Sequence, residues 1–309
     1  MRKKNHNTDW QVSRRDFLKA SSAMLAGLAA SSPLAFAGGL AARRKLRIGI
    51  VTDAHYADAD VKRSRYYRES LAKMTECVSQ MNEQKAGFLI ELGDFKDQAQ
   101  PPDEKTTIQY LRTIENAFQQ FDGPRYHVLG NHDMDSISKA QFLNAVTNTG
   151  ISSGAKYYSF DTRGVHFIVL DANVRGDGAD YDAGNYDWTD ANVPPEQLDW
   201  LEQDLASTSN PVIVFVHQRL DGQDDTTIRN AADVRQILQQ SNKVLAVFQG
   251  HHHPGAYSRI DGIHYYTLKA MVEGTGEDNN AYAIVDVHNN LDITVTGYRK
   301  ALSAEMERV

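Results

Sequence analysis

The chain contains a single cysteine, Cys77, in 309 residues. It therefore cannot form a disulfide within itself, and its stability must come from packing. No activating motif surrounds this cysteine, so we expect a small core residue rather than a nucleophile. Basic residues are also in the minority, with 33 Lys and Arg against 40 Asp and Glu, a net charge of −7. Such a surface repels polyanions, which argues against a nucleic acid polymer as the partner.

The chain also lacks an apolar run that could convincingly span a membrane, because residues 20–34 are too few and too rich in serine, alanine and glycine. This stretch follows the twin arginines Arg14 and Arg15 and precedes Ala35-Phe36-Ala37, which is an A-x-A cleavage site. We expect residues 1–37 to be a twin-arginine signal peptide, with a basic amphipathic helix as the alternative.

Cleavage of this leader would start the mature chain near Gly38. The expected location is periplasmic or secreted, after export in the folded state by the twin-arginine machinery, with no membrane attachment after processing. Export after folding suits a protein that must first take up a metal. The mature part keeps 27 basic and 38 acidic residues, a net charge near −11, which is still compatible with a small anionic substrate held through metal.

Continuous apolar runs alternate along the mature chain with segments whose apolar residues recur every three or four positions. The runs predict buried strands, and the spacing predicts amphipathic helices. We expect strands at residues 46–52, 88–92, 126–129, 157–161, 165–170, 212–216, 244–248, 263–268, 281–286 and 291–297. We expect helices at residues 64–82, 103–121, 195–207 and 227–241.

Residues 172–195 differ from the rest in being rich in Gly, Asp and Asn, with three aromatic residues, Tyr181, Tyr186 and Trp188. A loop of this length in a compact domain is usually functional or disordered. The aromatic rings either stack on a base or ring of the substrate or only pack the loop. The sequence leaves both alternatives open.

Polar side chains with metal-binding chemistry follow five of the predicted strands. They are Asp53 and His55, Asp94, Asn131 and His132, His217, and His251 with His253. Ligands of open α/β sheets bind outside the carboxyl ends of the strands, so these side chains are expected to converge. Oxygen and imidazole donors without cysteine favour Mn, Fe, Zn or similar metals. Seven candidate ligands, with one carboxylate able to bridge, suit two ions about 3.5–4 Å apart.

The order of these motifs, D-x-H, G-D-x-x-D, G-N-H-D, H and G-H-x-H, resembles the calcineurin-like metallophosphoesterases. The resemblance extends from Asp53 to His253 and implies an α/β fold, a four-layer αββα sandwich of two mixed β-sheets flanked by helices. Because the motifs are spread over most of the mature chain, we expect one domain at residues 38–309.

The resemblance also implies a role for each motif residue. It assigns Asp53, His55 and His253 to the first metal. It assigns Asn131, His217 and His251 to the second, with Asp94 bridging the two. It makes His132 a catalytic residue that faces the substrate, and Asp97 and Asp133 groups that orient histidines. His252, at the variable place of G-H-x-H, is not expected to be a ligand. Gln98 stands where many family members have arginine.

Three further segments resemble the manganese-dependent ADP-ribose/CDP-alcohol diphosphatase branch of the family. They are residues 66–71 (YYRESL), 195–201 (PEQLDWL) and 250–258 (GHHHPGAYS). Among Mn, Fe and Zn, the branch favours a pair of manganese ions. The central insert is shorter here than expected for those enzymes.

We therefore expect a hydrolase of phosphodiester or pyrophosphate bonds in small nucleotide-type molecules. Two metals would lower the pKa of a bound water, and hydroxide held between them would attack phosphorus while His132 protonates the leaving oxygen. The alternative is a phosphomonoesterase of alkaline-phosphatase type that uses the same site. A non-catalytic scaffold would typically lack His132 or several ligands, and metal storage by residues 251–253 leaves Asp94 and Asn131 unexplained.

Overall fold

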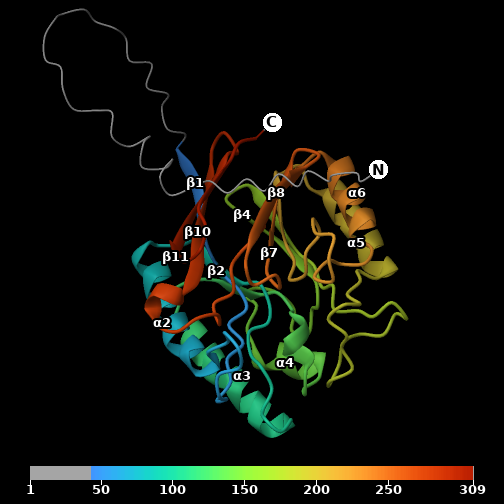
Figure 1. Cartoon of the computed structure of the whole chain (residues 1–309). Coiled ribbons are helices and arrows are strands. Elements are labelled where there is room, and N and C mark those ends of the chain that lie inside the picture. The colour runs from blue at the N-terminus through green and yellow to red at the C-terminus, as the bar shows by residue number, and fades with distance from the viewer. Residues whose placement is uncertain (1–42, 309) are drawn as a thin grey trace, which may run out of the picture. The chain divides into compact units, whose positions relative to one another are not determined.

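Figure 1 shows the computed structural model, which describes residues 43–308. The predicted signal peptide and its cleavage site lie outside the described residues. The described residues form one compact unit. Within the described part, no helix has both the length and the apolar character needed to cross a membrane.

The first sheet has six strands in the order β12-β11-β10-β1-β2-β3. Its strands are β1 (Arg44–Val51), β2 (Phe88–Glu91), β3 (Arg125–His127), β10 (Ala281–His288), β11 (Ile293–Arg299) and β12 (Ala304–Met306). β1, β2 and β3 run parallel, whereas β10, β11 and β12 pair antiparallel. The parallel half is buried on both faces, which explains why its strands appear in the sequence as continuous apolar runs.

The second sheet also has six strands, in the order β4-β5-β6-β7-β9-β8. Its strands are β4 (Tyr158–Thr162), β5 (Val165–Val169), β6 (Val212–Phe215), β7 (Val244–Gln249), β8 (Ala256–Ile260) and β9 (Ile263–Thr267). β5, β6, β7 and β9 are parallel, and the edge strands β4 and β8 are antiparallel to their neighbours. Both sheets are therefore mixed.

The helices are α2 (Ser70–Glu83), α3 (Glu104–Phe118), α4 (Lys139–Ala145), α5 (Pro195–Ser207) and α6 (Ala231–Ser241). Short 3-10 turns occur at η1 (Tyr67–Glu69), η2 (Asn131–Met134) and η3 (Glu277–Asn279). α3 begins where the Asp103 side chain accepts a hydrogen bond from the Thr106 amide at 2.7 Å. α5 begins with proline in its first turn, where the missing N–H costs nothing.

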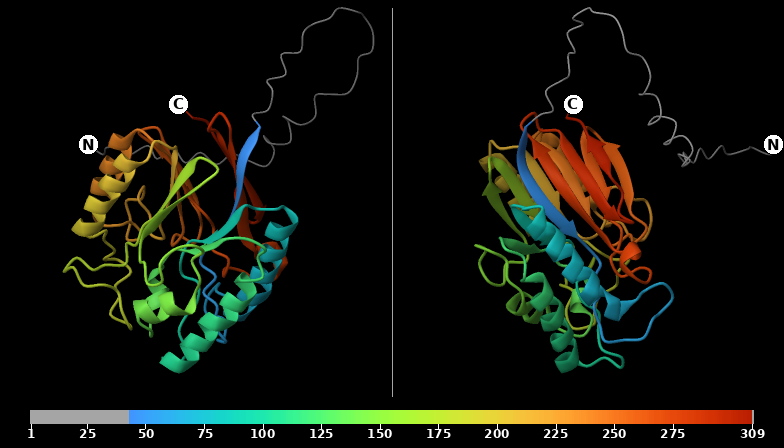
Figure 2. Two further views of the ribbon diagram at one scale, coloured as in Figure 1. Left: turned by 180° about the vertical axis from the view of Figure 1, so that it is seen from behind. Right: turned by 90° about the vertical axis from the view of Figure 1, so that its left-hand side faces the viewer.

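Three clusters of buried apolar residues fill the three spaces between four layers (Figures 1 and 2). The cluster between the sheets includes Phe88, whose ring lies 5.1 Å from that of Phe167 on the opposite sheet. A second cluster joins the first sheet to α2 and α3 and contains Cys77, and burial raises the pKa of this thiol. A third joins the second sheet to α5 and α6. The predicted αββα sandwich is confirmed.

Two predicted helices begin too early. The helix expected at 64–82 starts at Ser70. Before it, the Tyr66 amide donates to Val272 O, and the backbones of Lys62 and Arg65 bond to each other. The helix expected at 227–241 starts at Ala231. β8, β12 and α4 were not predicted, and each is short. The short edge strands show weak alternation, so their patterns resemble loops.

Candidate active site

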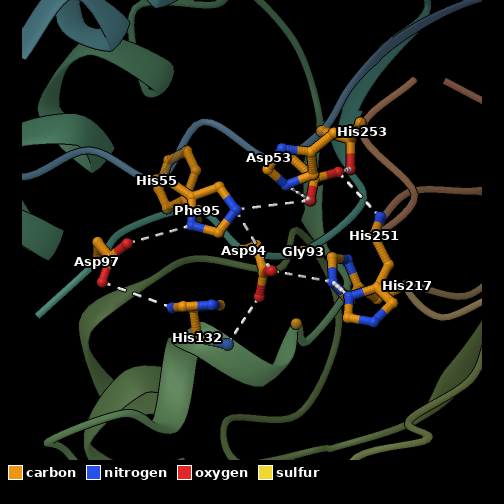
Figure 3. A network of polar contacts seen from close by, with 12 residues as sticks. Asp53, His55, Gly93, Asp94, Phe95, Asp97, His132, His217, His251 and His253 are labelled. Atoms are coloured by element: carbon orange, nitrogen blue, oxygen red, sulfur yellow. Dashed lines mark hydrogen bonds and ion pairs between the residues drawn. The ribbon is translucent and has the colours of Figure 1, made fainter. Parts of the chain in front are cut away.

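The polar residues that follow five strands meet at one end of the two sheets (Figure 3). β1, β2 and β3 of the first sheet carry Asp53, Asp94 and Asn131 just beyond their carboxyl ends. β6 and β7 of the second sheet carry His217 and His251 in the same way. Parallel strands end at a common edge, so all five loops meet there.

The backbone of this region adopts conformations that side chains other than glycine rarely take. Asp53, His55, Asp94 and His251 have φ values of 51°, 44°, 55° and 64°. Positive φ costs free energy in non-glycine residues and is retained mainly where the surrounding structure enforces it, often at functional sites. Gly130 is required for space, because a Cβ there would lie 2.0 Å from the Asp94 amide nitrogen. The glycine before Asn131 thus lets two metal-site loops touch.

Asp53, His55 and His253 place their ligand atoms within 4.8 Å of one another. His253 Nε2 lies 3.4 Å and His55 Nε2 lies 3.6 Å from Asp53 Oδ1. The other carboxylate oxygen of Asp53 accepts hydrogen bonds from Thr52 Oγ1 and from the His251 amide. One oxygen is therefore braced, and the other remains directed at the two imidazoles.

A second group consists of Asp94, His217 and His251, also within 4.8 Å of one another. His217 Nδ1 donates to the Leu92 carbonyl at 2.7 Å, so its Nε2 carries the free lone pair. That Nε2 lies 3.2 Å from His251 Nδ1. Asn131 is buried, and neither atom of its amide group has a hydrogen-bond partner.

Asp94 lies between the two groups (Figure 3). Its Oδ2 is 3.4 Å from His55 Nε2 and 3.2 Å from His217 Nε2. Its Oδ1 accepts a hydrogen bond from the His132 amide at 2.7 Å, which fixes the carboxylate plane. This position is the one that a carboxylate bridging two cations requires.

The donor set fits a pair of divalent cations. Buried polar atoms normally have hydrogen-bond partners, yet several here have none. These atoms are Asp53 Oδ1, both ring nitrogens of His55, His251 Nε2 and the two amide atoms of Asn131. The donors are imidazole, carboxylate and amide groups, which suit Mn, Fe or Zn.

The histidines of the second group illustrate the electrostatics of the site. Burial lowers the pKa of His217, but Asp94 and Asp53 outweigh it and raise this pKa to about 10. Burial and the neighbouring His217 lower the pKa of His251 to about 3. Two imidazole nitrogens that face each other cannot both carry a proton. A metal ion bound to both removes this conflict, because it needs both lone pairs.

His132 lies beside the metal-binding groups and is 22% exposed. Its ring is in edge-to-face contact with His55, with centroids 4.7 Å apart. Asp97 lies between the two histidines, 3.5 Å from Nδ1 of each. Burial lowers the pKa of His132, whereas Asp94 and Asp97 raise it, and the net direction is upward. His132 can thus present a proton to a bound substrate.

A family comparison agrees with this geometry. The model for calcineurin-like phosphoesterases matches residues 46–255, more than half of the chain and nearly all of the motifs. The chain belongs to the calcineurin-like phosphoesterase family. It is a metal-dependent hydrolase of phosphoric esters, and the two groups described above are its candidate site for two divalent ions.

Curated relatives of this phosphoesterase include two plant proteins named manganese-dependent ADP-ribose/CDP-alcohol diphosphatase. The one from Oryza sativa is 27% identical and aligns over 84% of this chain and 92% of its own length. The one from Arabidopsis thaliana is 26% identical over 87% of this chain and 99% of its own. A dimetal phosphatase from Danio rerio has the same fold, with a TM-score of 0.75 and 19% identity over 86% of this chain and 100% of its own.

One predicted role within the phosphoesterase site is wrong. Asp133 was expected to orient a histidine, but its carboxylate accepts hydrogen bonds from the backbone amides of Gly130, Asp94 and Phe95. It therefore ties the loop after β3 to the loop after β2. The reason is that these three backbone amides occupy the carboxylate oxygens that a histidine would need.

Three functional residues escaped the sequence reasoning. Glu273 Oε1 lies 2.6 Å from His253 Nδ1 and so orients a predicted ligand. Lys96 is buried, and its ammonium donates to His132 O at 2.6 Å and binds Asp135. Lys96 lies inside the G-D-x-x-D motif, which was the available signal. Glu273 and Asp135 are single acidic residues in loops, and no pattern distinguished them.

The aromatic residues of the 172–195 loop divide into two kinds. Tyr181 is fully buried and its hydroxyl donates to Asp187 O, so it packs the loop and has no surface for a substrate. The Tyr186 ring lies 5.6 Å from that of His132, and the Trp188 ring lies 6.1 Å from that of His251. Tyr186 and Trp188 also line a cavity of about 740 Å³ beside the site.

Proposed function

We propose that this phosphoesterase hydrolyses phosphodiester or pyrophosphate bonds of small nucleotide-type substrates, with manganese as the favoured metal. The observation that carries the proposal is the position of Asp94, whose Oδ2 faces both His55 and His217 within 3.4 Å. The plant relatives named manganese-dependent diphosphatases support it, because they align over more than nine-tenths of their length.

Two divalent ions held by the two groups of residues around Asp94 would neutralise the phosphoryl oxygens and would lower the pKa of the attacking water. The chain's own residues supply the rest. His132 donates a proton to the leaving oxygen. Asp97 faces Nδ1 of the His132 ring and orients it. The carboxylates of Asp94 and Asp53 supply negative charge that two bound cations would balance.

Tyr186 and Trp188 are proposed to bind the base or ring of the substrate. Both line the cavity beside His132, and Trp188 is 45% exposed. A flat aromatic surface next to the reacting centre suits a nucleobase, because every base has a face that can stack.

A metal-by-substrate panel on the protein without residues 1–37 tests this function. Mn, Fe and Zn are each combined with ADP-ribose, a CDP-alcohol, cyclic nucleotides, bis(p-nitrophenyl) phosphate and p-nitrophenyl phosphate. We expect the highest kcat/KM on a nucleotide diphosphate or diester with manganese. Faster release of phosphate from the nitrophenyl monoester than cleavage of any diester or diphosphate would support the phosphomonoesterase alternative instead.

We also propose export by the twin-arginine machinery, supported by the Arg14-Arg15 pattern and the Ala35-Phe36-Ala37 site. The N-terminal sequence of the protein isolated from the exported fraction should begin near Gly38. A protein that keeps its first 37 residues there would contradict the proposal.

A further inference from the structure

The segment before α2 is held beside the active site by hydrogen bonds to a distant part of the chain. The Tyr66 amide donates to Val272 O at 2.9 Å, and the Gly274 amide donates to Ser64 O at 2.8 Å. Arg65 pairs with Glu273 as an isolated bridge between these two stretches. The backbone at Arg65 is therefore fixed next to Glu273, which contacts the predicted ligand His253.

The guanidinium group of Arg65 is close to the reacting centre and partly open to solvent. Its Nε lies 3.9 Å from Glu273 Oε1, and the side chain is 31% exposed. Because Glu273 contacts the predicted ligand His253, a single carboxylate separates the guanidinium from the metal-binding group.

Neighbouring cations already have partners. Lys96 is buried, and its ammonium is bound to His132 O and Asp135. Arg68 is exposed and binds Asp58 and Asp60. The Nε of Arg65, by contrast, lies 3.9 Å from a Glu273 carboxylate oxygen that is already engaged by His253 at 2.6 Å, and the guanidinium also contacts the Tyr67 hydroxyl. Its guanidinium therefore retains donors for an anionic ligand.

We propose that Arg65 binds the second phosphoryl group of a pyrophosphate-containing substrate, the one that departs when the first is attacked. This inference rests on the proposed function and narrows it to diphosphates. A guanidinium group binds phosphate through two parallel hydrogen bonds, and a simple diester whose leaving group carries no phosphate offers no such partner.

The chemistry explains why a cation is needed beside the departing phosphoryl group. Hydrolysis adds one water across the P–O–P bridge: the water oxygen bonds to the attacked phosphorus, and the bond from that phosphorus to the bridging oxygen breaks. The electron pair of the broken bond stays on the bridging oxygen, which takes the proton of His132. One proton of the water then replaces the proton on His132, and the other passes to solvent. Two phosphomonoesters result, and Arg65 compensates the charge of the departing one.

The test compares R65Q with R63Q, because Arg63 is an exposed arginine two positions away in the same segment. Each purified variant is assayed with manganese on ADP-ribose and on bis(p-nitrophenyl) phosphate, and its bound manganese is measured. For R65Q we expect kcat/KM on ADP-ribose to fall roughly 10- to 100-fold, as for the loss of a hydrogen bond between charged groups. Activity on the nitrophenyl diester and the manganese content should stay unchanged, as should all three values for R63Q.

R65K keeps the charge and should recover part of the lost activity on ADP-ribose. Equal losses of R65Q on both substrates, or a loss of manganese, would overturn the inference, because Arg65 would then act only through Glu273 and His253. Unchanged activity on both would overturn it as well. If the wild-type protein cleaves bis(p-nitrophenyl) phosphate but no diphosphate, the inference fails while the phosphoesterase function stands. If it cleaves neither, the proposed function fails first.

Discussion

Glu273 Oε1 lies 2.6 Å from His253 Nδ1, so a carboxylate from the loop after β9 orients an imidazole from the loop after β7. The contact directs His253 Nε2 toward Asp53 Oδ1, 3.4 Å away. The hydrogen bond from His253 also lowers the pKa of Glu273 to about 2, which keeps this carboxylate ionised. The pair has the form of a carboxylate–histidine–metal triad.

Replacement of Glu273 should therefore weaken metal binding. We expect E273A to lose about 10- to 100-fold in manganese affinity, because the His253 ring loses its orienting acceptor. Calorimetric titration of the metal-stripped protein measures this directly. E277A is the matched control, since Glu277 is 79% exposed and contacts only Arg299 among the ion pairs of the described chain. Equal affinity of E273A and the wild type would contradict the assignment.

His132 should be needed for turnover and not for metal. H132A is expected to keep its manganese but to lose about 10²- to 10⁴-fold in kcat, the usual contribution of a general acid. Metal analysis and steady-state kinetics on the best substrate of the panel separate the two properties. H252A serves as control, because His252 occupies the variable place in G-H-x-H. Turnover of H132A at the wild-type rate would remove His132 from the mechanism.

Asp94 should be needed for the metals themselves. D94N keeps the shape of the side chain but removes the negative charge between His55 and His217. We expect it to bind less than the two manganese ions per chain expected of the wild type, with activity falling in proportion to the missing metal. Elemental analysis after dialysis gives the stoichiometry. D199N, at an exposed position of α5, should keep the full complement.

Trp188 should matter for nucleotides and not for small esters. W188A removes the exposed ring beside His251 and should raise KM for ADP-ribose about 5- to 100-fold, since stacking of a base on an aromatic ring contributes about 1–3 kcal/mol. KM for bis(p-nitrophenyl) phosphate should change much less. Y257A is a suitable control, because Tyr257 is 46% exposed and contacts His264 rather than the site. An unchanged KM for ADP-ribose would leave the cavity without a role in base binding.

His127 should make stability depend on pH. Its ring nitrogens lie 3.2 Å from Glu91 and 3.1 Å from Glu115, and although burial lowers its pKa, the two carboxylates raise it to about 9. The pKa of Glu91 is itself raised, because burial outweighs the histidine, so we regard Glu115 as the main partner.

A raised histidine pKa stabilises the folded chain fully below the unfolded value of about 6.5, and this contribution is lost as pH rises through about 9. The free energy of unfolding, measured by urea titration of the metal-free protein, should fall by on the order of 1–3 kcal/mol between these values. H127Q should be less stable at pH 6 and should show a flatter dependence. If the unfolding free energy of H127Q depended on pH as steeply as that of the wild type, His127 would be excluded as the source of this dependence.

Much of the fold could be predicted because the parallel strands are buried on both faces. Runs such as residues 46–52 and 212–216 are continuous and apolar, and the observed strands agree with them within two residues. The start of α2 could not be predicted, because the helical spacing continues into residues 64–69 while the backbones of Ser64 and Tyr66 bond to another loop. Such competition depends on residues more than 200 positions away.

Within the site, the residues that follow strands could be named from the sequence because their types and spacing form a motif. Glu273 and Asp135 could not, since a lone charged residue in a loop resembles any solvated one. Tyr181, Tyr186 and Trp188 look equivalent in sequence, yet Tyr181 is buried and Trp188 is exposed. Only the path of the loop distinguishes them.

The sequence by itself determined which strands are buried and which of them end in a carboxylate, an amide or an imidazole, because periodicity and side-chain chemistry are local properties. Tertiary structure alone decided that two separate sheets bring these ends to one edge, that Asp133 braces backbone instead of a histidine, and that Arg65 lies beside Glu273. Those outcomes depend on packing between segments far apart in the chain, and packing leaves no periodic trace in the order of residues.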